Sequence, residues 1–321
     1  MRGRLRQFYA IASLTTLEAA RQPVCLLLML TCLILTGLLP FVIMNQFGEQ
    51  GRLVRDSALS CHLVFGLFVG GLAACSAISR ETIRGTATTV ISKPVPRGLF
   101  FLAKYTGICG VLAVFSLCAT LATLMSERAA PRQFMPDWFV GGLLLLAPFL
   151  TCALAGINTF FSRRHFVSHA FCLLPVVLAA LFLIAGLLGG QDRPAGFGAA
   201  FAWRLVPANL LIAMAIAVLA AIAAALSTRL NTVPTLALCT ALFLLGLLAE
   251  HLFGRHAAQF GPAACLYALT PNLQHFWLAD ALTDGKRIPW HYVGGAARYA
   301  ALYAAGVLCL GAVSFQYREI S

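Results

Sequence analysis

The chain has 321 residues, of which 60% are hydrophobic and 11% are charged, whereas soluble globular proteins carry roughly 45–50% and about 25%. A soluble fold cannot keep so much apolar surface away from water, so the composition indicates an integral membrane protein. The formal net charge is +12, but the basic residues are scattered between apolar runs, which argues against nucleic-acid binding.

Eight segments are apolar and long enough to cross a bilayer core about 30 Å thick, which needs around 20 residues of helix. Because a backbone in lipid must satisfy its own hydrogen bonds, these segments are predicted to be α-helices. The expected fold class is all-α and polytopic, with residues 1–321 forming one domain. The eight segments are 24–44, 58–78, 105–125, 138–161, 170–188, 206–226, 233–253 and 292–313.

The N-terminal residues 1–23 precede the first span and are predicted to form a helix at the membrane interface. The apolar run that begins at Val24 is longer than the hydrophobic region of a signal peptide, and no small-residue cleavage site follows it. We therefore expect it to be retained as the first span. Glu18 and Arg21 have i, i+3 spacing on the interfacial helix and can pair.

The longest loop on the N-terminal side, residues 79–104, has the pattern of a short amphipathic helix followed by prolines. Apolar residues recur at helical spacing between Ile83 and Ile91, and polar residues occupy another face. Pro94 and Pro96 are expected to end this helix, because proline has no backbone N–H to donate.

The sequence also predicts the roles of two residues near the ends of this loop. Ser79 is a candidate N-cap for the helix. Lys104 follows the point where the chain re-enters the membrane, and its side chain is expected to extend to the interface. On the local pattern alone, a loop that lies on the membrane surface without a partner is an alternative.

Segments 170–188 and 206–226 are separated by a turn-forming stretch and admit a second interpretation. In that interpretation the chain has a six-span core, and two of the later segments are buried re-entrant pieces. We favour eight spans.

The long loop on the other side, residues 254–291, contains a second candidate amphipathic helix. Thr270 followed by Pro271 is typical of a helix start, and Gly285 is typical of a stop. We expect this helix to lie flat at the interface, and a substrate gate is the alternative. The side chains singled out on it are Phe276, Trp277, Asp280 and Asp284.

Lysine and arginine residues in the loops predict the orientation of the chain. If the N-terminus lies inside, the inner segments carry more of them than the outer ones, with the excess beside the first three spans. An even number of spans places both termini on one side. We therefore expect both termini in the cytoplasm.

The sequence contains no pattern typical of an enzyme. Neither H-E-x-x-H nor G-x-S-x-G occurs, and the eleven cysteines lie mostly in apolar runs without a C-x-x-C pair. His165 and His169 have the i, i+4 spacing of metal ligands, but Arg163 and Arg164 beside them disfavour a cation. No G-x-x-x-x-G-K-[ST] loop is present, so we expect the chain to bind no nucleotide, metal or other cofactor.

Three segments together resemble the permease subunits of type-2 ABC exporters, and the likeness spans nearly the whole chain. Arg80-Glu81-Thr82-Ile83-Arg84-Gly85-Thr86, then Ser92-Lys93-Pro94-Val95-Pro96-Arg97 and Ala103-Lys104, is similar to the family's "E-x-x-x-G-T…S-x-P-V-x-R…G-K" coupling segment. The run from Thr16 to Arg21 resembles the elbow before the first span, and Phe315 to Glu319 resembles the closing "F-x-x-R-E". The chain departs from the family at Ala103, where glycine is common, and in having eight spans rather than six.

The resemblance implies a permease in the bacterial inner membrane, paired with a second permease copy as a homodimer or paralogous heterodimer. A separate ABC ATPase subunit would bind ATP and Mg²⁺, and the helix at 82–92 would dock in a groove of that subunit. The residues implied in coupling are Glu81, Arg84, Gly85, Thr86, Pro94, Pro96 and Arg97, with Glu18 and Arg21 in the elbow.

Two other functions are compatible with the composition. An ion-coupled secondary transporter needs ionisable groups deep in its spans, whereas Glu250 and His62 are expected near outer span ends. Asn158, the deepest polar side chain, is more typical of a helix–helix contact. A membrane assembly factor that transports nothing is the other alternative, and no residue pattern indicates a cargo.

Overall fold

The computed structural model describes residues 2–43, 49–83, 96–130, 135–162, 165–188, 201–254, 267, 270–282 and 287–316. Regular structure within these residues is entirely helical, and eight helices are long and apolar enough to cross a membrane. The predicted all-α, polytopic fold is confirmed. The eight helices are α2 (Pro23–Val42), α3 (Gln50–Ile83), α5 (Arg97–Ala129), α6 (Trp138–Ser162), α7 (Phe166–Leu188), α8 (Leu205–Leu226), α9 (Thr232–Ala249) and α11 (Trp290–Gln316).

The two segments that left room for a six-span core both form long helices. The segment expected at 170–188 lies in α7, and the segment expected at 206–226 is α8. Each has the length and hydropathy that a span requires. The structure therefore favours eight spans over six.

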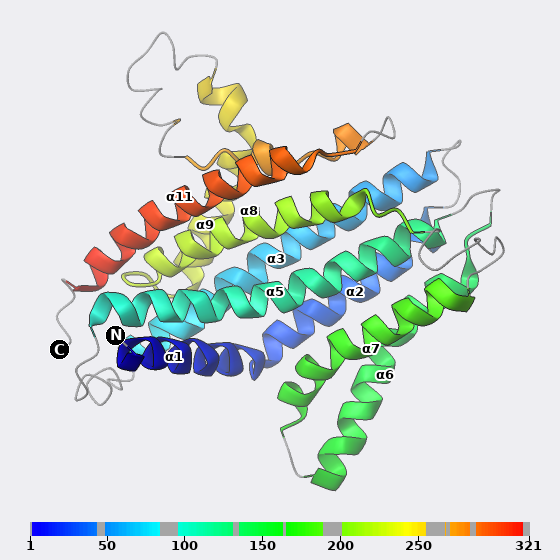
Figure 1. Cartoon of the computed structure of the whole chain (residues 1–321), viewed down its shortest axis with the longest axis horizontal. Helices are drawn as coiled ribbons and strands as arrows, with labels where there is room; N and C mark the ends of the chain where they lie inside the picture. The colour runs from blue at the N-terminus through cyan, green and yellow to red at the C-terminus, as the bar shows by residue number, and fades with distance from the viewer. Residues whose placement is uncertain are drawn as a thin grey trace.

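Helices α2, α3, α5, α8 and α11 run side by side along the long axis of the molecule (Figure 1). Helices α3, α5 and α8 pack against one another, α11 covers α8, α9 packs on α3, and α2 packs on α3 and α5. Helices α6 and α7 form a hairpin that contacts α2 and α5 and then diverges from the bundle. We call the end that carries both chain termini the terminal end, and the other the opposite end.

The centre of the bundle depends on small residues where α3 meets α8. A Cβ at Gly66 would clash with Ile216, and a Cβ at Gly70 would lie 3.3 Å from the Cβ of Ala220. Helices in lipid gain nothing from hiding apolar surface from one another, so their association relies on close van der Waals contact. Glycine permits that contact here because it brings no side chain between the two backbones.

The expected loop 79–104 is shorter at both ends than the sequence indicated. Helix α3 continues without a break to Ile83, so Ser79 lies inside a helix and the prediction that it is an N-cap is wrong. Helix α5 begins at Arg97, directly after Pro96 in an extended conformation (φ −58°, ψ 132°). The intervening residues 84–95, with Arg84, Gly85, Thr86, Pro94 and most of the predicted 82–92 helix, lie outside the described residues.

The predicted amphipathic helix after Thr270 is also wrong. Residues 270–282 form two short 3₁₀ turns, η2 (Leu273–Phe276) and η3 (Asp280–Leu282). Asn272 caps the first turn, because its side-chain oxygen accepts a hydrogen bond from the Gln274 backbone N–H at 3.2 Å.

This 270–282 segment packs into the bundle rather than lying flat on a surface. Leu273, Phe276, Ala279 and Leu282 are all buried, and they recur at every third residue. That spacing puts side chains on one face of a helix with 3.0 residues per turn but spreads them around an α-helix. The apolar spacing, and not the Thr-Pro start signal, was the informative part of the sequence.

Gly246 of α9 allows the 270–282 segment to approach the bundle, and its replacement by valine should loosen that contact. A Cβ at Gly246 would lie 2.6 Å from the Pro271 carbonyl oxygen, so we expect Gly246→Val to lower the free energy of unfolding by about 1–3 kcal/mol. Thermal unfolding of the purified chain in detergent measures the loss. Gly306→Val is the matched control, because a Cβ there meets nothing within 4 Å, and an equal loss in both variants would contradict the role of Gly246.

Candidate functional site

The N-terminal helix α1 (Arg2–Ala20) lies along the first half of α5 at the terminal end. The hydroxyl of Thr16 donates to the Gly107 carbonyl oxygen at 2.9 Å. A Cβ at Gly107 would lie 2.6 Å from the Ala12 carbonyl oxygen, and a Cβ at Gly110 would lie 2.9 Å from the Thr16 Oγ1. The missing side chains on α5 therefore let α1 pack directly on its backbone.

An ion pair joins the same two helices. Lys104 Nζ lies 3.8 Å from Glu18 Oε2, and the Lys104 side chain is 3% exposed against 48% for Glu18. The ammonium also lies 5.4 Å from the centre of the Phe100 ring. The expectation that Lys104 extends outward to the interface is wrong, because the close approach of α1 places a carboxylate within its reach.

Glu18 therefore has a partner on α5, although the sequence suggested a pair with Arg21 on its own helix. Arg21 lies in the exposed turn between α1 and α2, where α2 begins with a proline at its first residue. A proline at this position costs no hydrogen bond, because the first N–H groups of a helix have no partner within it. The resulting break turns the chain from α1 into the first span.

The last span reaches the start of α5 from the other side. The Phe315 ring centre lies 6.3 Å from that of Phe100 and 6.2 Å from that of Phe101. A Cβ at Gly311 would lie 2.8 Å from the Phe101 ring and 3.0 Å from the Cβ of Ala225. Helices α5, α8 and α11 thus converge at the terminal end.

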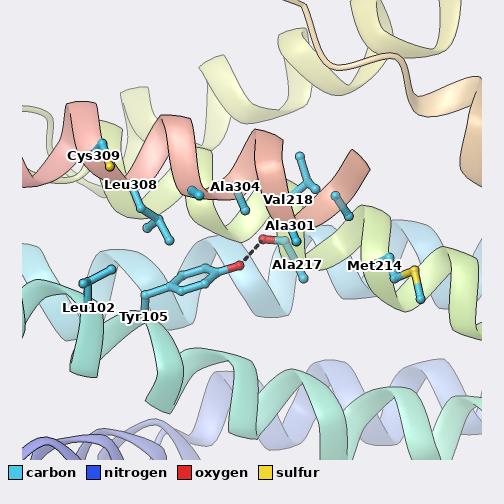
Figure 2. Close-up of a pocket in the computed structure, with 11 residues that line it drawn as sticks. Leu102, Tyr105, Met214, Ala217, Val218, Ala301, Ala304, Leu308 and Cys309 are labelled. Carbon is cyan, nitrogen blue, oxygen red and sulfur yellow. Dashed lines mark hydrogen bonds between the residues drawn. The ribbon is translucent and has the colours of Figure 1, made fainter. Parts of the chain in front are cut away.

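Arg229, in the turn after α8, adds a polar contact to this convergence. Its Nε donates to the Ser314 hydroxyl at 3.0 Å, and its Nη2 donates to the Ser314 carbonyl oxygen at 3.1 Å. Further along, α5 and α11 separate and leave an apolar groove with α8 as its floor (Figure 2).

The first turns of α5 are therefore the meeting point of the three segments that carry the family resemblance. Pro96 and Arg97 are exposed where α5 begins, and Glu81 lies in the last turn of α3. The structure brings the elbow helix, the exit of the 79–104 segment and Phe315 together, although they are far apart in the sequence.

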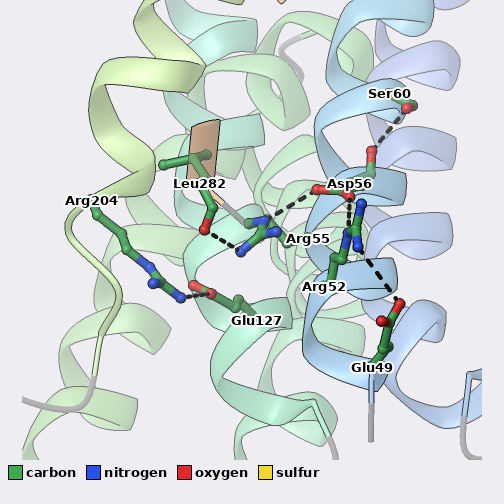
Figure 3. A network of polar contacts seen from close by, with 8 residues as sticks. All are labelled: Glu49, Arg52, Arg55, Asp56, Ser60, Glu127, Arg204 and Leu282. Atoms are coloured by element: carbon green, nitrogen blue, oxygen red, sulfur yellow. Dashed lines mark hydrogen bonds and ion pairs between the residues drawn. The ribbon is translucent and has the colours of Figure 1, made fainter. Parts of the chain in front are cut away.

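A second polar cluster lies at the opposite end (Figure 3). Arg55 is buried, and its Nη1 donates to the Leu282 carbonyl oxygen at 3.2 Å while its Nε lies 3.1 Å from Asp56 Oδ1. Arg204 Nη2 lies 3.2 Å from Glu127 Oε1. Arg55 precedes the span predicted at 58–78, because the first two turns of α3 are too polar to be recognised as part of a span.

Glu250 joins α9 to the residues that follow it. It begins the π-helical turn η1 (Glu250–Gly254), and its Oε2 accepts from the Tyr267 hydroxyl at 2.7 Å and from Asn272 Nδ2 at 3.4 Å. The hydrogen bond to Glu250 raises the pKa of Tyr267. The Asn272 backbone N–H donates to the Tyr299 hydroxyl at 3.0 Å, so the network also reaches α11.

Of the four residues singled out in the 254–291 loop, the structure describes the side chains of Phe276 and Trp277. Phe276 is buried in the core and Trp277 is half-buried. Asp280 lies in η3, and Asp284 lies outside the described residues. Phe276 anchors the 270–282 segment, and the expectation of an exposed amphipathic face at this position is wrong.

His62 is placed differently from the sequence-based expectation. The second span runs from Gln50 to Ile78, so His62 lies near its middle and not at its outer end. The side chain is 0% exposed, and its Nδ1 lies 2.9 Å from Asn209 Oδ1 on α8. The error arose because the span was predicted to begin at residue 58.

The remaining polar candidates have structural partners. Asn158 of α6 lies with its Nδ2 3.3 Å from His169 Nδ1 on α7, which agrees with the expected helix–helix contact. His169 is therefore engaged with an amide, and among the described residues no group of three potential ligands could hold a metal ion.

Comparison with known proteins finds no match to a family model, to a curated protein or to a solved structure.

The ion pair between Glu18 of α1 and Lys104 of α5 should contribute measurably to stability. Glu18→Gln leaves the buried Lys104 ammonium with a weaker acceptor, so we expect the free energy of unfolding to fall by about 1 kcal/mol. This value lies between those typical of exposed and of buried ion pairs, because the Glu18 side chain is half exposed. Arg21→Gln, which removes an exposed charge from the next turn, is the control and should have a smaller effect. Thermal unfolding in detergent distinguishes them, and equal losses would argue against the Lys104 contact.

Proposed function

We propose that this chain is the membrane-spanning permease subunit of an ATP-binding cassette exporter, which forms the translocation path and couples to a separate ATPase subunit. The observation that carries the proposal is the convergence of the elbow helix, the start of α5 and Phe315 at the terminal end. The coupling residues proposed from the sequence lead directly into that junction through Pro96 and Arg97.

The junction offers a physical route from a docked partner to the spans. A displacement of the segment between α3 and α5 moves α5, because α5 begins at once after Pro96. Helix α5 contacts α1 through Lys104 and Gly107, and it contacts α11 through Phe101 and Gly311. Packed elements of this kind move as rigid bodies, which suits a domain rotation driven from one end.

In this proposal the terminal end lies in the cytoplasm of a bacterium, in agreement with the excess of basic residues beside the first spans. Glu81 and Arg84 make charged contacts with the ATPase. Gly85 allows helix backbones to approach closely, and Thr86 forms a local hydrogen bond. Pro94 and Pro96, which Arg97 follows directly, stiffen the return to the membrane. ATP and Mg²⁺ bind to the partner, whose closure tilts two permease copies between inward- and outward-facing states.

Charge reversal in the coupling segment tests this proposal. We expect Glu81→Lys, and likewise Gly85→Leu, to abolish ATPase activity stimulated by the permease while membrane insertion is retained. Glu49→Lys is the matched control, because this exposed glutamate lies at the opposite end. The measurement is ATP hydrolysis by the co-purified complex in proteoliposomes, and an ATPase encoded beside this chain is the natural partner to express.

The proposal fails if the chain co-purifies with no ATPase and both coupling variants behave like the unmodified protein. That outcome would favour a membrane assembly factor or an ion-coupled transporter.

The buried His62–Asn209 pair favours ion-coupled secondary transport as a second candidate, because an ionisable side chain deep in a span is costly and often marks an ion pathway. An ATP-driven permease should keep stimulated ATPase activity at the unmodified level in His62→Gln and in Glu250→Gln. A proton-coupled transporter should instead acidify proteoliposomes under a membrane potential, and either substitution should abolish that flux. Proton flux through the purified chain alone, without any ATPase, decides between the two functions.

A further inference from the structure

The groove between α5, α8 and α11 has a volume of about 460 Å³. Leu102 and Tyr105 form the α5 wall, Ala217 lies on the α8 floor, and Ala301, Ala304 and Cys309 lie on the α11 wall (Figure 2). The volume falls in the range of roughly 300–1,000 Å³ typical of small-molecule sites.

Two features of the sequence create the groove. At the terminal end, Gly311 lets the three helices meet closely around Phe101. Toward the middle of α11 the facing residues are alanines, whose side chains are too short to fill the space as the helices separate. The groove is therefore closed at one end by a tight contact and opened beside it by small side chains.

The groove opens toward the lipid and not toward water. It lies within three membrane-spanning helices, and its rim residues Leu102, Ala301 and Cys309 are exposed on the surface of the bundle. A polar occupant would find no charged side chain among the lining residues. The Tyr105 hydroxyl is already engaged, because it donates to the Ala217 carbonyl oxygen at 3.0 Å.

The physical chemistry of such a space restricts what can fill it. A water molecule needs two to four polar partners, and an apolar cavity of this kind stays dry. An empty groove would cost the dispersion contacts of every residue that lines it. A flexible hydrocarbon chain needs no polar partner and restores the dispersion contacts of the lining residues. The surrounding bilayer supplies such chains at the groove opening.

We propose that this groove is a binding site for one acyl chain of a bilayer phospholipid, which is retained between α5 and α11 as part of the folded protein. The lining selects for hydrocarbon and contains nothing that recognises a headgroup, so an ordinary membrane phospholipid is the occupant. The proposal does not depend on the function proposed above. It does place a lipid beside α5, the helix that would transmit movement from the coupling segment.

Native mass spectrometry of the full chain, purified in a mild detergent, tests the proposal. The unmodified chain should retain one phospholipid more tightly than the rest, and it should rebind palmitoyl-oleoyl phosphatidylethanolamine after delipidation. In Ala301→Phe the ring occupies the groove, and loss of about two buried methylene groups predicts a roughly tenfold lower lipid affinity. Gly306→Phe is the matched control, since position 306 lies outside the groove in open space.

A second variant separates lipid loss from a local defect in α11. Leu102→Trp fills the groove from the opposite wall. Both filling variants should therefore bind the lipid about tenfold more weakly than the control does. Their thermal unfolding in lipid-free detergent should match that of the control. The proposal is overturned if the unmodified chain retains no phospholipid. It is equally overturned if the filling variants bind as tightly as Gly306→Phe, or if the retained molecule is not a phospholipid.

Discussion

Close contact at residues without side chains is the interaction on which this bundle depends. Transmembrane helices are already surrounded by hydrocarbon, so packing Leu against Leu gains little over packing Leu against lipid. What favours association is close approach of one helix to another, and the structure shows it where α3 meets α8, where α1 meets α5 and where α11 meets α5 and α8. Gly66 and Gly70 hold α3 to α8, Gly107 holds α1 to α5, and Gly311 holds α11 to α5 and α8. The groove beside Gly311 follows from the same rule, because the alanines of α11 are too short to reach Leu102 and Tyr105 of α5 where the two helices separate.

Two buried charges, one near each end of the bundle, join segments that the glycines bring together. At the terminal end, Lys104 can be buried because α1 carries Glu18 to within 3.8 Å of it. At the opposite end, Arg55 can be buried because the 270–282 segment presents the Leu282 carbonyl oxygen to it. Neither charge could be placed there without its partner, since an uncompensated buried charge costs several kcal/mol. The charged contacts are thus consequences of packing, and they fix the register of segments that the glycines only allow to approach.

The spans were predictable from the sequence because hydropathy over about 20 residues is a local property of the chain. The predictions that were wrong concern features that depend on contacts with other helices, which the local sequence does not reveal. Lys104 was expected at the interface because nothing in its own segment indicates that Glu18 lies opposite. His62 was assigned to a span end because the polar first turns of α3, which include Arg55, concealed its true start. The 270–282 segment was predicted as an α-helix from its start signal, although its apolar spacing of three residues matches the 3₁₀ turns that the structure contains. The candidate coupling residues were identified by resemblance, and the junction they lead into became visible only in three dimensions.

Helix α5 unites these observations. It is in contact with α1, α2, α3, α6, α7, α8 and α11, so no large movement of α5 can occur without displacing most of the bundle.

The contacts of α5 differ in kind along its length. Near its start, glycine contacts and an ion pair attach it firmly to α1, whereas its contact with α11 is firm only around Phe101 and gives way to the groove at Tyr105. A force applied at Pro96 would therefore move α1 and α5 together. The α5–α11 interface can open or close with little loss of protein–protein contact, because an acyl chain rather than protein fills the space between these two helices. The weak side of α5 is the one that faces the proposed lipid, and this is where a conformational change of the bundle would be easiest to accommodate.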